Sequence, residues 1–193
     1  MTKTDRYVEC SAAGMKYRLI PVTDEIIRCV IAKDEVKTEQ ESLIIEKKEY
    51  PQVPFEAAEA DGAVTVKTSA VQAELNLKTG GITWKHADGS VWLEQNKADL
   101  TRIDVVHYNT GGEIPIINRV KTVDGERNFI QNLKAEKVRD GYRARVFFDW
   151  KEDEEIHGLG QAEEGIYNYR EHTQYLYQHN MRIPMPMFVS TEG

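Results

Sequence analysis

The segment from Tyr167 to Asn180 carries the side chains best suited to binding a small polar ligand. Its 14 positions hold four tyrosines together with arginine, histidine, glutamine and asparagine side chains. Aromatic faces stack on the C–H surfaces of sugars, and amide and guanidinium groups form hydrogen bonds with hydroxyls. The composition therefore favours a carbohydrate ligand, although the tyrosines of a half-buried strand would give the same pattern.

Acid–base chemistry on a glycoside would require two carboxylates flanking one bond. The chain contains 32 acidic residues, and their spacing does not single out such a pair. The densest cluster, residues 152–155 (Glu-Asp-Glu-Glu), is expected to be a solvated approach to a strand, because neighbouring carboxylates repel one another. Spacing alone therefore identifies no catalytic pair.

Three other kinds of site lack support in the sequence. The Gly158-Leu159-Gly160 motif lacks the third glycine of a dinucleotide fingerprint, and Glu163-Glu164 would repel a pyrophosphate. The five histidines show neither i, i+4 pairing nor a carboxylate spacing typical of metal ligands. No Gly-x-Ser-x-Gly motif is present to indicate a serine nucleophile. We therefore expect no metal and no cofactor.

Composition and charge narrow the possible partners. Apolar residues make up 40% of the chain and charged residues 30%, as in ordinary globular domains. The net charge of −7, with both signs interspersed, argues against a nucleic-acid partner. No apolar run approaches the roughly 20 residues of a membrane span, and the first residues lack the apolar core of a signal peptide. We therefore expect a cytoplasmic protein with no membrane partner.

The two cysteines, Cys10 and Cys29, fall in separate segments with the apolar pattern of strands. Buried thiols are expected there rather than a disulfide, since a reducing compartment keeps thiols free. No Cys-x-x-Cys spacing indicates a structural zinc site.

Alternation of apolar and polar residues predicts β-strands along most of the chain. The clearest case is residues 71–77, where Val, Ala, Leu and Leu alternate with polar residues, and Gly80-Gly81 follows as a turn. The other expected strands lie at residues 24–32, 42–46, 64–67, 82–84, 91–93 and 142–150.

Asp-Gly pairs mark expected turns between these strands, at residues 61–62, 88–89, 124–125 and 140–141. No stretch of 12 residues shows an amphipathic helical period. This combination predicts an all-β fold, a large antiparallel β-sandwich with little helix, rather than an alternating βαβ fold. The length of 193 residues suits one domain, so we predict a single domain over residues 1–193.

The last 39 residues contain a recognisable order of motifs. Residues 155–161 read Glu-Ile-His-Gly-Leu-Gly-Gln, a polar segment with Gly165, Asn168 and Arg170 follows, and an apolar strand begins at Ile183-Pro184-Met185-Pro186. This order resembles glycoside hydrolase family 31, the family of α-glucosidases and α-xylosidases. The family pattern is Glu-x-(Tyr/Phe)-Gly-Leu-Gly-(Glu/Gln), then a polar segment and an Asn-containing loop, then an apolar strand ending Ser-x-x-Gly-Tyr-Gly.

The resemblance implies a galactose-mutarotase-like β-sandwich, placed in the longer enzyme before a (β/α)8 catalytic barrel. The family's two catalytic aspartates lie in that barrel, so the resemblance implies no catalytic residue within residues 1–193. It also implies that the chain is truncated before the barrel and inactive by itself. The partners expected are its own C-terminal catalytic barrel and an α-linked oligosaccharide substrate.

One loop of the family's sandwich contacts the sugar through an Asn-Arg-Asp tripeptide. Gln178, His179 and Asn180 stand at the matching positions of this sequence. Asn180 replaces the sugar-contacting aspartate and keeps an acceptor oxygen, so a hydroxyl contact without the charge is implied. His157 replaces the usual aromatic residue and is expected to be a packing position.

Two other functions fit the same composition. A self-standing carbohydrate-binding module would use the aromatic segment without a barrel. A mutarotase-like sugar epimerase would need a carboxylate base and a histidine acid, for which His107 with a downstream glutamate is the only pair considered. We also expect self-association of the fragment, since the strand over residues 181–189 would leave apolar surface and a strand edge exposed.

Overall fold

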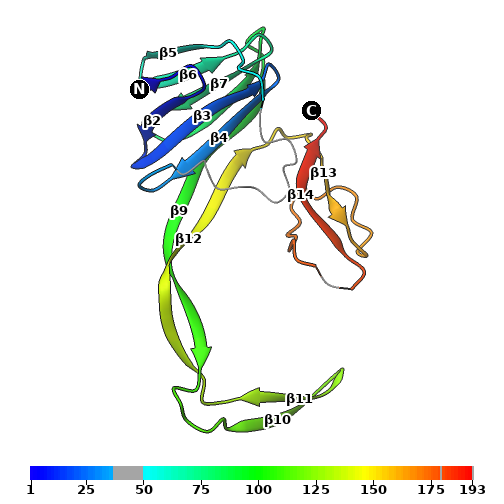
Figure 1. The fold of residues 1–193 in the computed structure, drawn as a ribbon. Helices are drawn as coiled ribbons and strands as arrows, with labels where there is room; N and C mark the ends of the chain where they lie inside the picture. Colours follow the sequence, from blue (N-terminus) through cyan, green and yellow to red (C-terminus); the bar gives the residue numbers. More distant parts are fainter. Residues whose placement is uncertain (37–49, 179, 193) are drawn as a thin grey trace. The chain divides into compact units, whose positions relative to one another are not determined.

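The computed structural model describes residues 1–36, 50–178 and 180–192 (Figure 1). These residues form strands and turns with no helix, which confirms the predicted all-β fold class. They group into two compact units, unit 1 (residues 1–98 and 146–193) and unit 2 (residues 99–145). Each unit is described separately. The strand predicted at residues 42–46 lies outside the described residues.

Unit 1 begins with a four-stranded antiparallel sheet in sequence order, drawn in blue in Figure 1. Its alternating sequence buries every second residue, as in Val8, Cys10 and Ala12. The strands are β1 (Thr2–Lys3), β2 (Val8–Ala12), β3 (Met15–Thr23) and β4 (Ile26–Ala32).

A second, six-stranded sheet has the order β12-β9-β8-β7-β6-β5. Its successive neighbours from β5 to β9 are antiparallel and joined by short turns, which is why the chain needs no crossover helix. The strands are β5 (Glu56–Ala60), β6 (Ala63–Lys67), β7 (Val71–Asn76), β8 (Ile82–His86), β9 (Val91–Asn109) and β12 (Lys134–Asp149).

The core lies between these two sheets. The first sheet contributes the fully buried side chains of Val8, Tyr17 and Leu19. The second contributes Val64, Val66, Ala73, Leu75 and Ile82, which are all 0 or 1% exposed. Each set occupies alternate positions of its strands, so each sheet turns its apolar face towards the other. The predicted antiparallel sandwich is confirmed.

Polar contacts join the two sheets at their ends. The Tyr17 hydroxyl donates a hydrogen bond to the Gly80 carbonyl at 3.0 Å, and the Ala13 amide donates to the Leu77 carbonyl at 3.1 Å. A Cβ at Gly80, whose φ is +73°, would lie 2.4 Å from the Tyr17 hydroxyl oxygen. Glycine is therefore required there both by the backbone conformation and by the close approach of the tyrosine.

Cys10 is buried and Cys29 is partly buried, and both are free thiols, as the sequence predicted. Burial raises the pKa of both groups, that of Cys29 to about 12. These thiols are packing residues of the sandwich rather than reactive groups.

Unit 2 is built from the outer parts of β9 and β12 together with the hairpin of β10 (Ile117–Thr122) and β11 (Gly125–Ile130). The hairpin is antiparallel, with Ile117 opposite Ile130 and Thr122 opposite Gly125. Every residue of unit 2 is described, and none of them is buried. Unit 2 therefore consists of two pairs of strands, β9 with β12 and β10 with β11, without a core of its own.

The turn predicted at Asp140-Gly141 is wrong, because both residues lie inside β12. A Cβ at Gly141 would lie 2.7 Å from a methyl carbon of Val105, so glycine makes room for this neighbouring side chain. Asp140 accepts a hydrogen bond from Arg102 and forms an ion pair with Lys137. These two cations lower the pKa of Asp140 to about 2. Asp140-Gly141 therefore makes contacts across the β9–β12 strand pair and does not reverse the chain.

Unit 1 ends with a separate antiparallel pair of strands, β13 (Ile156–Gln161) and β14 (Ile183–Ser190). In the described part of the chain, no helix reaches the length and hydropathy that a bilayer crossing requires.

Alkaline pH should destabilise the sandwich. Burial raises the pKa of Tyr17 to about 12, as it does for Cys29, so the folded protein keeps both protons to a higher pH than the unfolded chain. The free energy of unfolding should therefore fall by roughly a few kcal/mol as the pH rises from about 9 to about 12. Urea unfolding at pH 8 and pH 11 measures this drop.

Tyr17→Phe is the informative control for this titration. Because this variant lacks the hydrogen bond to Gly80, its free energy of unfolding at pH 8 should be about 1 kcal/mol lower than that of the parent protein. Its free energy of unfolding should also fall less between pH 8 and pH 11. Equal drops in the two proteins would contradict the assignment of the titration to Tyr17.

Candidate functional site

The pairing of β13 with β14 brings the two ends of the polar segment together. Ile156 lies opposite Ser190 at one end of the pair, and Gln161 lies opposite Ile183 at the other. Residues 162–182 form the loop between the two strands, and they contain the whole aromatic segment that the sequence singled out. The base of this loop is therefore set by the register of two strands.

The Gly158-Leu159-Gly160 motif lies at an irregularity of the β13–β14 ladder, where Gly158 pairs with Phe188 and Gly160 with Pro184, so the extra residues lie on β14. The register shifts between Gly158 and Gly160, and the three residues have φ values of +100°, +61° and +95°. A Cβ at Gly160 would lie 2.0 Å from the Ile183 carbonyl oxygen, and one at Gly158 would lie 2.8 Å from the Met187 carbonyl oxygen. Both glycines are thus required by conformation and by the close approach of β14.

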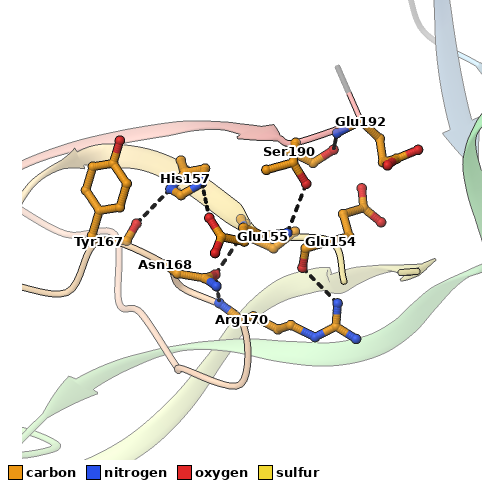
Figure 2. A network of polar contacts seen from close by, with 10 residues as sticks. Glu154, Glu155, His157, Tyr167, Asn168, Arg170, Ser190 and Glu192 are labelled. Atoms are coloured by element: carbon orange, nitrogen blue, oxygen red, sulfur yellow. Dashed lines mark hydrogen bonds and ion pairs between the residues drawn. The ribbon is translucent and has the colours of Figure 1, made fainter. Parts of the chain in front are cut away.

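Asn168 holds the middle of the loop against the start of β13 (Figure 2). Its side-chain oxygen accepts hydrogen bonds from the Ile156 amide at 3.1 Å and from the Arg170 amide at 3.0 Å. The Tyr169 amide donates to the Ile156 carbonyl at 2.7 Å. The side-chain oxygen of Asn168 therefore holds the loop backbone at Arg170 next to the first residue of β13.

Arg170 ties the same loop to the segment before β13. Its guanidinium donates to the carbonyl oxygen of Glu154 (Figure 2) and to that of Lys151. The Glu154 side chain is only 5% exposed and accepts a hydrogen bond from the Lys151 amide at 2.9 Å. The expectation that all of residues 152–155 are solvated is thus wrong for Glu154, because this carboxylate closes a turn beneath Arg170.

His157 is a contact residue of the loop, consistent with the packing role expected for it. Its ring lies 4.7 Å from the Tyr167 ring, Nδ1 is 2.9 Å from the Tyr167 carbonyl oxygen and Nε2 is 3.2 Å from the Glu155 carboxylate. Both partners are acceptors, so the ring can donate a hydrogen bond to either of them. His157 thus fastens Tyr167 to β13.

An open pocket of about 770 Å³ lies where the loop returns to β14. Two of the three predicted sugar-contacting residues, Gln178 and Asn180, line it and are exposed. His179, the third, lies outside the described residues. The remaining lining residues are Gln161, Ala162, Met181, Arg182 and Ile183.

The pocket offers hydrogen-bonding groups rather than acid–base groups. The Gln178 side-chain amide donates to the Arg182 carbonyl at 2.8 Å, which closes the turn that carries Asn180. Arg182 is held in an ion pair with Glu164. None of the described lining residues is a carboxylic acid or a histidine, so this part of the pocket can bind hydroxyls but cannot protonate a glycosidic oxygen.

The four tyrosines of the segment do not form one stacking surface. Tyr167, Tyr175 and Tyr177 are 82%, 73% and 62% exposed, and Tyr167 rests on His157. Tyr169 instead lines a second, smaller cavity of about 330 Å³ together with Trp150. The aromatic composition of the segment is therefore shared between exposed positions and packing.

Sequence reasoning missed Gln161 and Arg182 as lining residues of the larger pocket. Gln161 ends the glycine motif and Arg182 precedes the apolar strand, and only the strand pairing makes them neighbours. An arginine next to an otherwise apolar strand was the available signal. Among the residues that the structure describes, no group of three His, Cys, Asp or Glu side chains is placed to hold a metal ion.

Comparison with known proteins identifies solved structures that share the fold of this chain. No protein-family model matches the sequence. The structure of the whole chain is similar to part of the GH31 alpha-xylosidase from Xanthomonas citri, with a TM-score of 0.75 and 20% sequence identity. It is also similar to part of a GH31 alpha-xylosidase from a soil metagenome, solved in complex with xylose, with a TM-score of 0.64 and 16% identity.

The chain has the fold of a segment of these GH31 enzymes. All of its residues are covered by both similarities, but it spans only 18% and 26% of the lengths of the two enzymes. In both neighbours, therefore, the corresponding segment is part of a much longer chain. Identities this low show a common fold and do not transfer a substrate.

Gly160→Ala should disrupt the pairing of β13 with β14. The new Cβ would collide with the Ile183 carbonyl, so we expect a loss of at least about 3 kcal/mol from the pair, or its separation. Hydrogen exchange of the β13 and β14 amides measures this loss.

The matched control is Gly165→Ala. Gly165 also has a positive φ, +65°, but nothing lies within 4 Å of the Cβ that the substitution would add. It should cost only about 1–2 kcal/mol of backbone strain and leave the exchange protection of β14 intact. Equal effects at the two positions would show that close approach of the strands is not the reason for Gly160.

Proposed function

We propose that this chain is the non-catalytic β-sandwich of a GH31-type retaining α-glycosidase, which supports the catalytic barrel and contributes a loop to the sugar site. The observation that carries the proposal is the similarity of the whole chain to a minor part of two such enzymes. The motif order at residues 155–193 supports the same family independently.

An exposed apolar face on β14 fits the supporting role. The side chains of Ile183, Met185, Met187 and Val189 alternate along the strand and are 48–59% exposed. On the opposite face, Phe188 is packed, with its ring 5.4 Å from that of Trp150. A strand with apolar residues on both faces is typical of one that is covered on both sides, here by a following barrel.

The loop role rests on Gln178 and Asn180. Both line the open pocket, and the contact of Gln178 with the Arg182 carbonyl fixes the turn between them. An amide can accept from one sugar hydroxyl and donate to another, so Asn180 would orient a sugar without contributing charge. The reacting carboxylates would come from the barrel, and the substrate would be an α-linked oligosaccharide such as an α-xyloside or α-glucoside.

A self-standing carbohydrate-binding module is the alternative that the exposed tyrosines favour. Tyr175 and Tyr177 are 73% and 62% exposed on the loop and could stack on a sugar. The open shape of the pocket argues against tight binding by this chain alone, because most of a bound sugar would stay in water.

The epimerase alternative has less support. His107 is exposed on β9 in unit 2, where no residue is buried. An acid and a base that act on a sugar ring need a pocket that excludes water around both groups. The location of His107 provides no such pocket within unit 2.

The test of the proposal is a comparison of the 193-residue chain with the product of the reading frame that continues beyond codon 193. The chain alone should not hydrolyse 4-nitrophenyl α-xyloside or α-glucoside above buffer. The longer product should hydrolyse at least one of them. Saturable turnover by the chain alone, or a reading frame without a barrel, would refute the proposal.

In the longer product, Asn180→Ala should lower kcat/KM roughly 10- to 100-fold, the effect of losing about 1.4–3 kcal/mol of contacts to the sugar. Asn128→Ala is the matched control, since Asn128 is an exposed asparagine of β11 in unit 2. Its kcat/KM should stay within about twofold of the parent, and an equal loss in both variants would contradict the sugar contact.

Calorimetry on the 193-residue chain separates the domain from a binding module. With maltose, isomaltose and xylose we expect no binding tighter than about 1 mM, because the chain would provide only one wall of the site. Micromolar binding that is lost in Tyr175→Ala or Tyr177→Ala would favour the binding module instead.

A further inference from the structure

The loop between β13 and β14 is held by different contacts in its two halves. Asn168 and Arg170 attach the first half to the start of β13 and to the segment before it. The second half carries Gln178 and Asn180 at the pocket, and its contacts run through Arg182. Arg182 thus links the pocket residues to the rest of the loop.

Arg182 contacts two separate parts of the loop. Its carbonyl oxygen accepts a hydrogen bond from the Gln178 side-chain amide at 2.8 Å, and its guanidinium forms an ion pair with Glu164. Glu164 follows the end of β13, and Arg182 directly precedes the start of β14. Because Gln161 lies opposite Ile183, the ion pair joins the two chain segments just beyond the last residue pair of the ladder.

The ion pair is partly shielded from water. The side chains of Arg182 and Glu164 are 22% and 29% exposed. The Nε of Arg182 is buried and has no hydrogen-bond partner among the described residues. Removal of the Glu164 charge would therefore leave a partly buried cation without the carboxylate that compensates it, which costs more than the loss of a fully exposed pair. We expect the Arg182 side chain to leave its place in that case and turn towards solvent.

A displacement of Arg182 would move the pocket residues with it. Asn180 lies two residues before Arg182, within about 7 Å along the chain, and the contact between Gln178 and the Arg182 carbonyl closes the turn that carries it. The groups of a binding site have to be held to within about 0.5 Å of their productive geometry. A small shift at Arg182 is therefore enough to misplace the Asn180 amide.

We propose that the ion pair between Glu164 and Arg182 is a clasp that positions Asn180 for its contact with the sugar. Glu164 is a positioning residue, because it acts through Arg182 and is not among the described residues that line the pocket. The contact with sugar rests on the proposed function, whereas the closure of the loop by the ion pair does not.

Tryptic cleavage of the 193-residue chain measures the clasp without any activity. Trypsin has to take up the Arg182 side chain, so it cleaves after this residue only when the ion pair has opened. Glu164→Gln should raise the rate of cleavage after Arg182 at least about fivefold, followed by mass spectrometry. Cleavage after Arg170, which is held by the Glu154 carbonyl, should change less than about twofold.

Glu163→Gln is the matched control, because it removes the same charge from the adjacent, exposed residue of the same loop. It should leave the rate of cleavage after Arg182 within about twofold of the parent chain. Equal rates for the two variants would overturn the clasp. An equal rise after Arg170 in Glu164→Gln would overturn it as well, since the substitution would then loosen the whole loop rather than its second half.

A double-mutant cycle in the longer product tests whether the clasp acts through Asn180. Glu164→Gln should lower kcat/KM about 3- to 10-fold in the parent background and less than about twofold in the Asn180→Ala background, where the positioned contact is already absent. Glu163→Gln should stay within about twofold in both backgrounds. Losses that simply multiply would show that Glu164 does not position Asn180, and would overturn the proposal.

The two measurements separate the failure of the clasp from the failure of the proposed function. An active longer product in which the losses multiply refutes the clasp alone. A longer product that hydrolyses neither 4-nitrophenyl glycoside refutes the proposed function and, with it, the sugar contact that the clasp would position. In that case the tryptic rates still decide whether the ion pair closes the loop.

Discussion

The close approach of β13 and β14 at Gly158 and Gly160 is the constraint on which the candidate site depends. Gly158 and Gly160 let the two backbones come within a distance that no side chain could occupy, and the positive φ values between them shift the register. This shift sets Gln161 opposite Ile183 and so determines where the loop begins and ends. The pocket exists because these two residues are neighbours.

The polar groups of the loop serve two different purposes. Asn168 and Arg170 form hydrogen bonds with backbone groups around β13, and these contacts fix the first part of the loop against that strand. Gln178 and Asn180, which lie further along, face the pocket. A polar, aromatic segment of this kind thus combines residues that hold the loop with residues that line the pocket.

Part of this could be predicted from the sequence and part could not. Alternation identified β7 and the all-β class because side-chain direction in a strand depends only on local backbone geometry. The same local reasoning failed at Asp140-Gly141, where the deciding partner, Val105, is distant in sequence. It also failed at Glu154, whose buried carboxylate accepts a hydrogen bond from the Lys151 amide. Gln178 and Asn180 were named through a family resemblance, and their role in binding sugar stays a prediction.

The sequence by itself determined the all-β class, several of the strands, most of the turns and the presence of a glycine motif before a polar loop, since all of these depend on neighbouring residues. Only the tertiary structure decided what the motif does, which side chains line the pocket and which apolar residues stay exposed. Those features depend on pairing between strands separated by more than 20 residues, as with Gln161 and Ile183. Such pairing is selected by the packing of the whole domain, and a local pattern does not record it.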